Sequence, residues 1–202
     1  MPTNTAPKPR TTKPYRPAPN LRSILAALKP LADAAYRDGM SKRFGITGPT
    51  AATALGVPMA KLEPLAKSIG RNHDLALKLW DHHGRGQYEC RMLAAFIDEP
   101  DRITSVQMDR WCKAFDNWAT CDTVCFKLFD RVDPDLAFGK VEKWAASKHE
   151  FIKPGAFALL ASLALHNKSL PDEPFLAALA LTEQAATDER NFVRKAVNWA
   201  LR

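Results

Sequence analysis

The feature that most constrains this fold is a nearly unbroken helical pattern that begins at Leu21 and runs to the end of the chain. Apolar side chains recur there at three- and four-residue spacing, as they do along one face of an α-helix. Alanine and leucine dominate the apolar positions, and no segment alternates between apolar and polar residues as a half-buried strand would. The sequence therefore predicts an all-α fold.

Capping and turn residues divide this pattern into separate helices. We expect Ser23 to cap the first helix and Gly70 to end the helix that begins at Met59. Further helices are predicted over residues 73–82, 87–97, 103–115, 122–131, 135–147, 155–166, 172–187 and 190–201.

These helices are predicted to form short antiparallel pairs that recur about every 35 residues, a period typical of helical-pair repeats. The second helix of each pair is expected to begin near Tyr88, Asp122, Gly155 and Asn191. Stacked pairs of this kind build an α-α superhelix, or solenoid, with a concave face. A closed helical bundle is the alternative architecture.

The net charge of +7 is unevenly distributed along the chain. Residues 1–20 contain six prolines and no acid, and their cations are Lys8, Arg10, Lys13 and Arg16. Such a segment cannot bury enough surface to offset the entropy of ordering it, so we predict a disordered basic tail over 1–20 and one domain over 21–202. The tail either attracts a phosphate backbone non-specifically or only improves solubility.

Composition also excludes several classes of protein. No stretch has the length of a membrane span, and the N-terminus has no apolar signal core. The four cysteines are too few for a secreted disulfide scaffold and are expected to be buried free thiols: Cys90, Cys112, Cys121 and Cys125. We therefore expect a soluble, cytoplasmic monomer.

Metal and cofactor motifs are not evident in the sequence. Cys121 and Cys125 are four residues apart, but no nearby cysteine or histidine completes a tetrahedral set. His82 and His83 are adjacent, so on a helix their imidazoles point in different directions. Glycine-rich phosphate loops and the HExxH and GxSxG motifs are absent from the sequence. We expect neither a metal nor a cofactor.

The first candidate functional group is Trp118 with Asp122. These residues are four apart, so they share one face if the helix already includes Trp118. An indole beside a carboxylate suits a cationic centre, because the ring face attracts positive charge and the anion stabilises it. The structural alternative is that Trp118 is a core residue and Asp122 an ordinary residue near a helix N-terminus.

The second candidate group lies in the last predicted helix. Phe192, Ala196 and Trp199 fall on one stripe, and Arg194 and Lys195 lie on the flanking faces. This pattern also fits an ordinary amphipathic helix with a solvated basic side.

The third candidate is Lys153, which precedes Pro154. Proline is comfortable at the first position of a helix, so Lys153 would stand at a helix N-terminus within reach of a phosphate. A solvated lysine is the alternative.

With these three groups of residues, the sequence resembles the DNA alkylation-repair glycosylases of the AlkD-like, HEAT-repeat type. The resemblance covers about residues 22–202. Supporting segments are Met40-Ser-Lys-Arg-Phe-Gly-Ile, Leu55-Gly-Val, Leu62-Glu-Pro-Leu-Ala-Lys, Leu79-Trp and Tyr88-Glu-Cys-Arg91.

The resemblance implies a superhelix whose concave basic face holds duplex DNA. It implies excision of cationic N3- or N7-alkylated purines without base flipping, unlike the usual extrusion strategy of glycosylases. By similarity, Asp122 would stabilise the positive charge on the deoxyribose and orient water, while Trp118 and Trp199 would pack against the damaged nucleotide. The DNA-binding residues implied in the same way are Lys153, Arg194, Lys195 and Arg91.

One departure from the family pattern concerns position 154. An arginine that grips DNA in the family is replaced here by Pro154, which has no charge and no side-chain donor. Lys153 offers a point charge but lacks the bidentate geometry of arginine. Two alternatives therefore stay open beside the glycosylase: a non-catalytic HEAT-like binder of nucleic acid, and a protein-binding helical scaffold.

Overall fold

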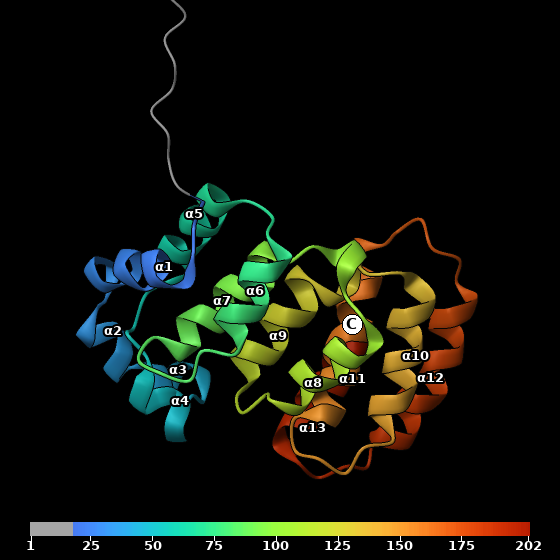
Figure 1. Ribbon diagram of the computed structural model, residues 1–202. Helices are drawn as coiled ribbons and strands as arrows, with labels where there is room; N and C mark the ends of the chain where they lie inside the picture. The colour runs from blue at the N-terminus through green and yellow to red at the C-terminus, as the bar shows by residue number, and fades with distance from the viewer. Residues whose placement is uncertain (1–17) are drawn as a thin grey trace, which may run out of the picture.

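The computed structural model describes residues 18–202, and within this range every regular element is a helix (Figure 1). The all-α prediction is confirmed for this part of the chain. Residues 1–17, which hold most of the predicted tail, lie outside the described residues. None of the described helices is both long enough and apolar enough to cross a membrane.

The described residues contain thirteen α-helices and three short 3-10 helices. The α-helices are α1 Leu21–Leu28, α2 Ala34–Asp38, α3 Met40–Phe44, α4 Gly48–Thr53, α5 Met59–Ile69, α6 His73–Trp80, α7 Gln87–Ile97, α8 Ser105–Lys113, α9 Trp118–Lys127, α10 Pro134–Ala145, α11 Ile152–His166, α12 Glu173–Ala185 and α13 Asn191–Leu201. The 3-10 helices are η1 Lys29–Leu31, η2 Pro100–Arg102 and η3 Phe129–Arg131. The short helices α2, α3 and α4 were not anticipated by the sequence pattern.

The later helices stack in two rows. Helices α7, α9, α11 and α13 form one row, in which each helix packs against the next, and α10 packs beside α12 in the other row. Within pairs, α6 packs on α7, α10 on α11 and α12 on α13. The second helices begin close to the predicted positions. This arrangement of successive pairs favours the stacked superhelix over a closed bundle.

The first helix begins differently from the prediction. Its cap is Asn20, whose side chain accepts a hydrogen bond from the Ser23 backbone N–H at 3.1 Å. Ser23 completes the capping box, because its hydroxyl accepts from the Asn20 N–H at 2.9 Å. Asn20, placed in the tail by the sequence, therefore belongs to the folded domain. Gly70 ends α5 as predicted, with φ of 77°.

Helix α9 begins four residues earlier than predicted, and this shift matters for the candidate site. Asn117 caps it by accepting the Thr120 N–H at 2.8 Å, so Trp118 is its first residue. Trp118 and Asp122 consequently lie one turn apart on the same helix face.

Helix α11 also begins earlier than predicted, at Ile152, so Pro154 is its third residue rather than its first. Proline is tolerated there because the N–H groups of a first helical turn have no partner within the helix. The helix is buried along Pro154–Leu163 and forms the centre of the C-terminal half.

Candidate functional site

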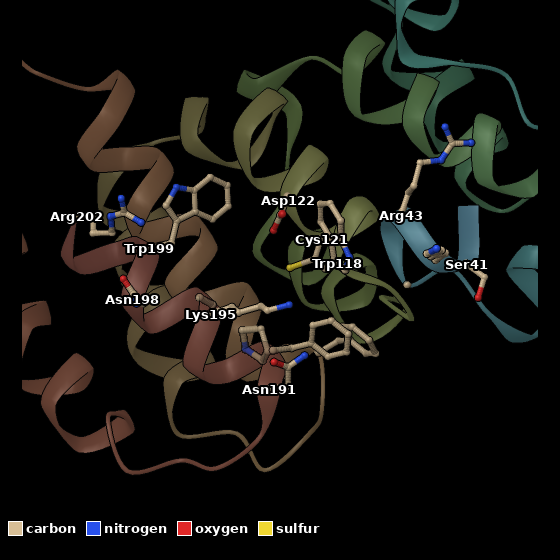
Figure 2. A pocket seen from close by; sticks show the side chains of 16 residues that line it. Ser41, Arg43, Trp118, Cys121, Asp122, Asn191, Lys195, Asn198, Trp199 and Arg202 are labelled. Atoms are coloured by element: carbon tan, nitrogen blue, oxygen red, sulfur yellow. The ribbon is translucent and has the colours of Figure 1, made fainter. Parts of the chain in front are cut away.

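A pocket of about 670 Å³ lies where α3, α9, α11 and α13 meet (Figure 2). Its lining combines aromatic, cationic and amide side chains with one acid, Asp122. The lining residues are Ser41, Lys42, Arg43, Gly45, Trp118, Cys121, Asp122, Phe151, Pro154, Asn191, Phe192, Lys195, Ala196, Asn198, Trp199 and Arg202.

Trp118 forms one wall of the pocket and is held by α3. Its half-buried indole meets the Phe44 ring edge-on, with ring centroids 5.9 Å apart. Gly45 follows Phe44 in a left-handed conformation with φ of 61°, and a Cβ at this position would come within 3.3 Å of the indole. The glycine thus lets the backbone after α3 approach Trp118 closely.

Asp122 lies in the pocket without a hydrogen-bond or ion-pair partner among residues 18–202. Burial disfavours its charged form and raises the pKa of the carboxyl to about 7. A cation placed beside it would favour the ionised form and lower that pKa again. A positively charged ligand beside Asp122 would therefore stabilise its carboxylate.

Trp199 supplies the second indole, from α13. Its side chain is 43% exposed and stacks on Phe126 of α9 with ring centroids 4.6 Å apart and an interplanar angle of 13°. Figure 2 shows Asp122 between Trp199 and Trp118. Trp118, Asp122 and Trp199 therefore line one pocket.

Cations line the same pocket. Lys195 precedes Trp199 by one helical turn and extends into the pocket in Figure 2. Within the described part of the chain, Lys42, Lys195 and Arg202 have no acid at ion-pair distance. Arg43 instead turns back on its own segment, where it donates to the Tyr36 carbonyl at 2.9 Å.

The model of a protein family described as DNA alkylation repair enzyme matches residues 24–202. This match covers most of the chain. The chain belongs to the DNA alkylation repair enzyme family. The family resemblance predicted from the sequence is confirmed.

A solved structure shares the fold of this family member, with a TM-score of 0.76 at 18% identity, over 90% of this chain and 74% of that chain. It is described as representing a new family of proteins related to the HEAT-like repeat DNA glycosylases with affinity for branched DNA structures. The HEAT-like fold predicted from the sequence is thereby confirmed. A comparison with curated proteins gave no match.

Three of the four predicted DNA-binding residues lie outside the pocket lining: Lys153, Arg194 and Arg91. Lys153 forms an ion pair with Asp188 at 3.2 Å, and Asp188 also binds Arg190 at 2.6 Å. The hydrogen bonds from Arg190 hold the pKa of Asp188 well below its usual range. Much of the charge of Lys153 is therefore already matched, whereas Arg194 is exposed on α13.

Arg91, predicted as a DNA contact, lies in the interior instead. It is 6% exposed, donates to the Ala114 carbonyl at 3.1 Å and lies 5.3 Å from the centre of the Trp80 ring. Its guanidinium is also 3.9 Å from Asp116, which accepts a hydrogen bond from Asn117 at 2.7 Å. The expectation of an exposed Arg91 is therefore corrected: burial leaves little of its side chain accessible to any ligand, and its contacts are with the loop that leads into α9.

The cysteines of this family member are all buried free thiols, as the sequence predicted. Burial raises the pKa of Cys90 to about 12 and raises the pKa values of Cys112 and Cys125 strongly. Cys121 lines the pocket but has only 2% of its surface exposed. Among residues 18–202, no three His, Cys, Asp or Glu side chains are grouped so as to hold a metal ion.

Sequence reasoning did not assign a role to the pocket residues of α3. The segment Met40–Gly45 supported the resemblance, yet nothing local indicated that it closes the pocket against Trp118. Asn191, Asn198 and Arg202 were also not assigned. Their positions on the Trp199 helix were the available signal, because residues one turn apart share a face.

Proposed function

We propose that this protein is a monofunctional DNA N-glycosylase that removes cationic N3- or N7-alkylated purines from duplex DNA without flipping the base. The observation that carries the proposal is the carboxyl of Asp122, which has no partner among residues 18–202 and is set between two indoles in an open pocket. A half-buried acid with a perturbed pKa in such a pocket is a recognised mark of a functional site.

The chemistry suits these side chains. An alkylated purine already carries a positive charge, so it leaves without a strong general acid. As the bond between C1′ and the purine nitrogen breaks, its electron pair goes to the purine, and positive charge develops on the deoxyribose. The Asp122 carboxylate stabilises this charge, and the faces of Trp118 and Trp199 add cation–π attraction.

Water then completes the reaction. Its oxygen bonds to C1′ on the face opposite the departing base, and its proton passes to Asp122 or to solvent, which leaves an abasic site and a neutral alkylpurine. A carboxyl with a pKa of about 7 can accept this proton and return it to solvent near neutral pH.

Duplex DNA would be held by the cations around the pocket. Lys195, Lys42 and Arg202 lack acidic partners within the described region and are therefore available to phosphates, and Arg194 is exposed on a neighbouring face of α13. Lys153 would contribute less, because Asp188 already binds it. Each phosphate neutralised in this way gives a log–log salt slope of about −0.9.

A second candidate function is binding of DNA without catalysis. Pro154 favours it, since this residue lines the pocket and offers neither charge nor donor. The related solved structure, described as having affinity for branched DNA, favours it too. The two candidates differ in whether Asp122 is required for the protein's action on DNA.

The deciding experiment measures release of 7-methylguanine and 3-methyladenine from methylated duplex DNA. The glycosylase proposal predicts release well above the spontaneous rate and a loss of about 100-fold in Asp122→Asn, the scale seen when one transition-state contact is removed. Asp135→Asn, at an exposed position of α10, is the matched control and should keep full activity. Binding without release would favour the non-catalytic candidate.

A further inference from the structure

A second hollow, here called the α1 groove, has a volume of about 860 Å³. It lies between α1, the turn that follows it and the loop that joins α6 to α7. Its lining residues are Leu21, Arg22, Leu25, Ala26, Lys29, Ala32, Leu55, His82 and Arg85. None of them lines the pocket around Asp122.

The α1 groove has an apolar floor. Leu21 and Leu25 are one helical turn apart on α1 and only half-buried, and Leu55 is buried beside them. Ala26 and Ala32 are small and exposed, so they leave space above the leucines. Covering this apolar surface would be favourable, because it removes hydrocarbon from water.

The rim of the groove is basic. Arg22, Lys29 and Arg85 are exposed, and none has an acid at ion-pair distance in residues 18–202. None of the groove's lining residues, all within the described part of the chain, is acidic. The first twenty residues contain no acid either and add four cations immediately before α1, so they cannot supply the missing negative charge.

One wall of the groove is held in place before any ligand arrives. The His82 ring nitrogen Nε2 lies 3.1 Å from the Arg85 carbonyl oxygen, and a Cβ at Gly84 would come within 2.9 Å of the His82 ring. The loop therefore packs closely on itself. A preformed wall lowers the conformational entropy that this loop itself would lose when a partner binds.

We propose that the α1 groove is a docking site for an acidic segment of a partner protein, with apolar side chains on the floor and carboxylates against the rim. The exposed cations of the rim favour an anionic ligand. The leucines of the floor favour a ligand that also has apolar side chains. A DNA backbone satisfies the first requirement but not the second. This assignment is independent of the glycosylase proposal.

The test uses the full chain and a short fluorescein-labelled peptide of Asp and Glu, with Leu and Phe at every third or fourth position. Fluorescence anisotropy should show binding that weakens at least about tenfold when Ser replaces Leu and Phe. Arg22→Glu with Arg85→Glu should weaken it equally. Ala26→Trp, which fills the groove from an exposed position, should do the same without touching any charge.

The matched control is Lys113→Glu, which reverses an exposed lysine on α8. It should leave peptide affinity within about twofold of wild type. Ala26→Trp should also retain any activity on methylated DNA. The proposal is overturned if the peptide does not bind, if Ala26→Trp binds it normally, or if the serine peptide binds equally well and duplex DNA displaces it.

Discussion

Two aspartates on consecutive helices, Asp109 and Asp122, differ in their hydrogen-bond partners and in the direction of their pKa shifts. Asp109 on α8 accepts hydrogen bonds from Lys143 at 2.7 Å and Trp144 at 2.8 Å, and its carboxylate lies 2.8 Å from the Lys140 ammonium. Burial alone would raise its pKa, but these three donors together lower it to about 2. Asp122 on α9 is half-buried, no donor among residues 18–202 reaches its carboxyl, and its pKa rises to about 7. The fold thus surrounds Asp109 with donors and leaves the Asp122 carboxyl in the pocket without them.

The raised pKa of Asp122 implies that ionising it costs folding stability. A half-buried acid that serves only the structure is expected to have partners, as Asp109 does. An acid without partners gains them when a cationic ligand arrives, which is the condition proposed for the damaged nucleotide.

The largest difference between the two aspartates is expected for Asp122→Asn. The folded pKa of about 7 exceeds the ordinary value of 3.8, so wild-type stability falls as pH rises from about 4 to about 7 and then levels off. The variant lacks this loss and should be more stable at pH 8 by about 2 kcal/mol, which is several degrees in Tm. Its glycosylase activity should nevertheless fall about 100-fold.

Thermal unfolding at pH 4 and pH 8 provides the control for this prediction. The stability gain of Asp122→Asn should be much smaller at pH 4, where the wild-type carboxyl is protonated in the fold. A variant that is destabilised at both pH values would show that the carboxylate has partners in solution.

Asp109→Asn should have the opposite effect on stability. It leaves the Lys140 ammonium, whose side chain is 4% exposed, without its acid, and the expected loss is about 3 kcal/mol at pH 7. Because the folded pKa of Asp109 is below the unfolded value, its stabilisation is present above about pH 4 and disappears as pH falls towards 2. Urea unfolding at pH 7 measures the loss, and an unchanged midpoint would contradict the contrast.

Smaller effects, on DNA affinity, are expected from the two lysines near the pocket, Lys195 and Lys153. Lys195→Ala should weaken duplex binding about fivefold and reduce the salt slope by about 0.9, since a free cation is lost. Lys153→Ala should change affinity by less than about twofold, because Asp188 already holds that ammonium. Anisotropy titrations over a range of salt concentrations distinguish the two, and equal effects would show that the ion pair opens on DNA.

Much of the fold and the centre of the candidate site could be predicted from the sequence, because both rest on local spacing. The helix periodicity predicted the repeats, and the four-residue interval placed Trp118 beside Asp122 once Asn117 capped α9. The stripe on α13 likewise indicated Trp199.

What the sequence could not predict depends on contacts between distant segments. Helix α7 is buried on nearly every side, so periodicity could not distinguish an interior Arg91 from a surface one. Lys153 meets an acid 35 residues away, and α3 closes on Trp118 across more than 70 residues. No local pattern encodes these pairings.

The proposed role of Asp122 requires that its carboxyl has no charged partner until a cation reaches it. The most direct measurement is titration of its carboxyl carbon by NMR, in the free protein and with duplex DNA that carries a cationic, non-cleavable sugar analogue. We expect a carboxyl pKa near 7 in the free protein and a clear decrease in the complex. A pKa near 4 in the free protein, unchanged by that DNA, would contradict it.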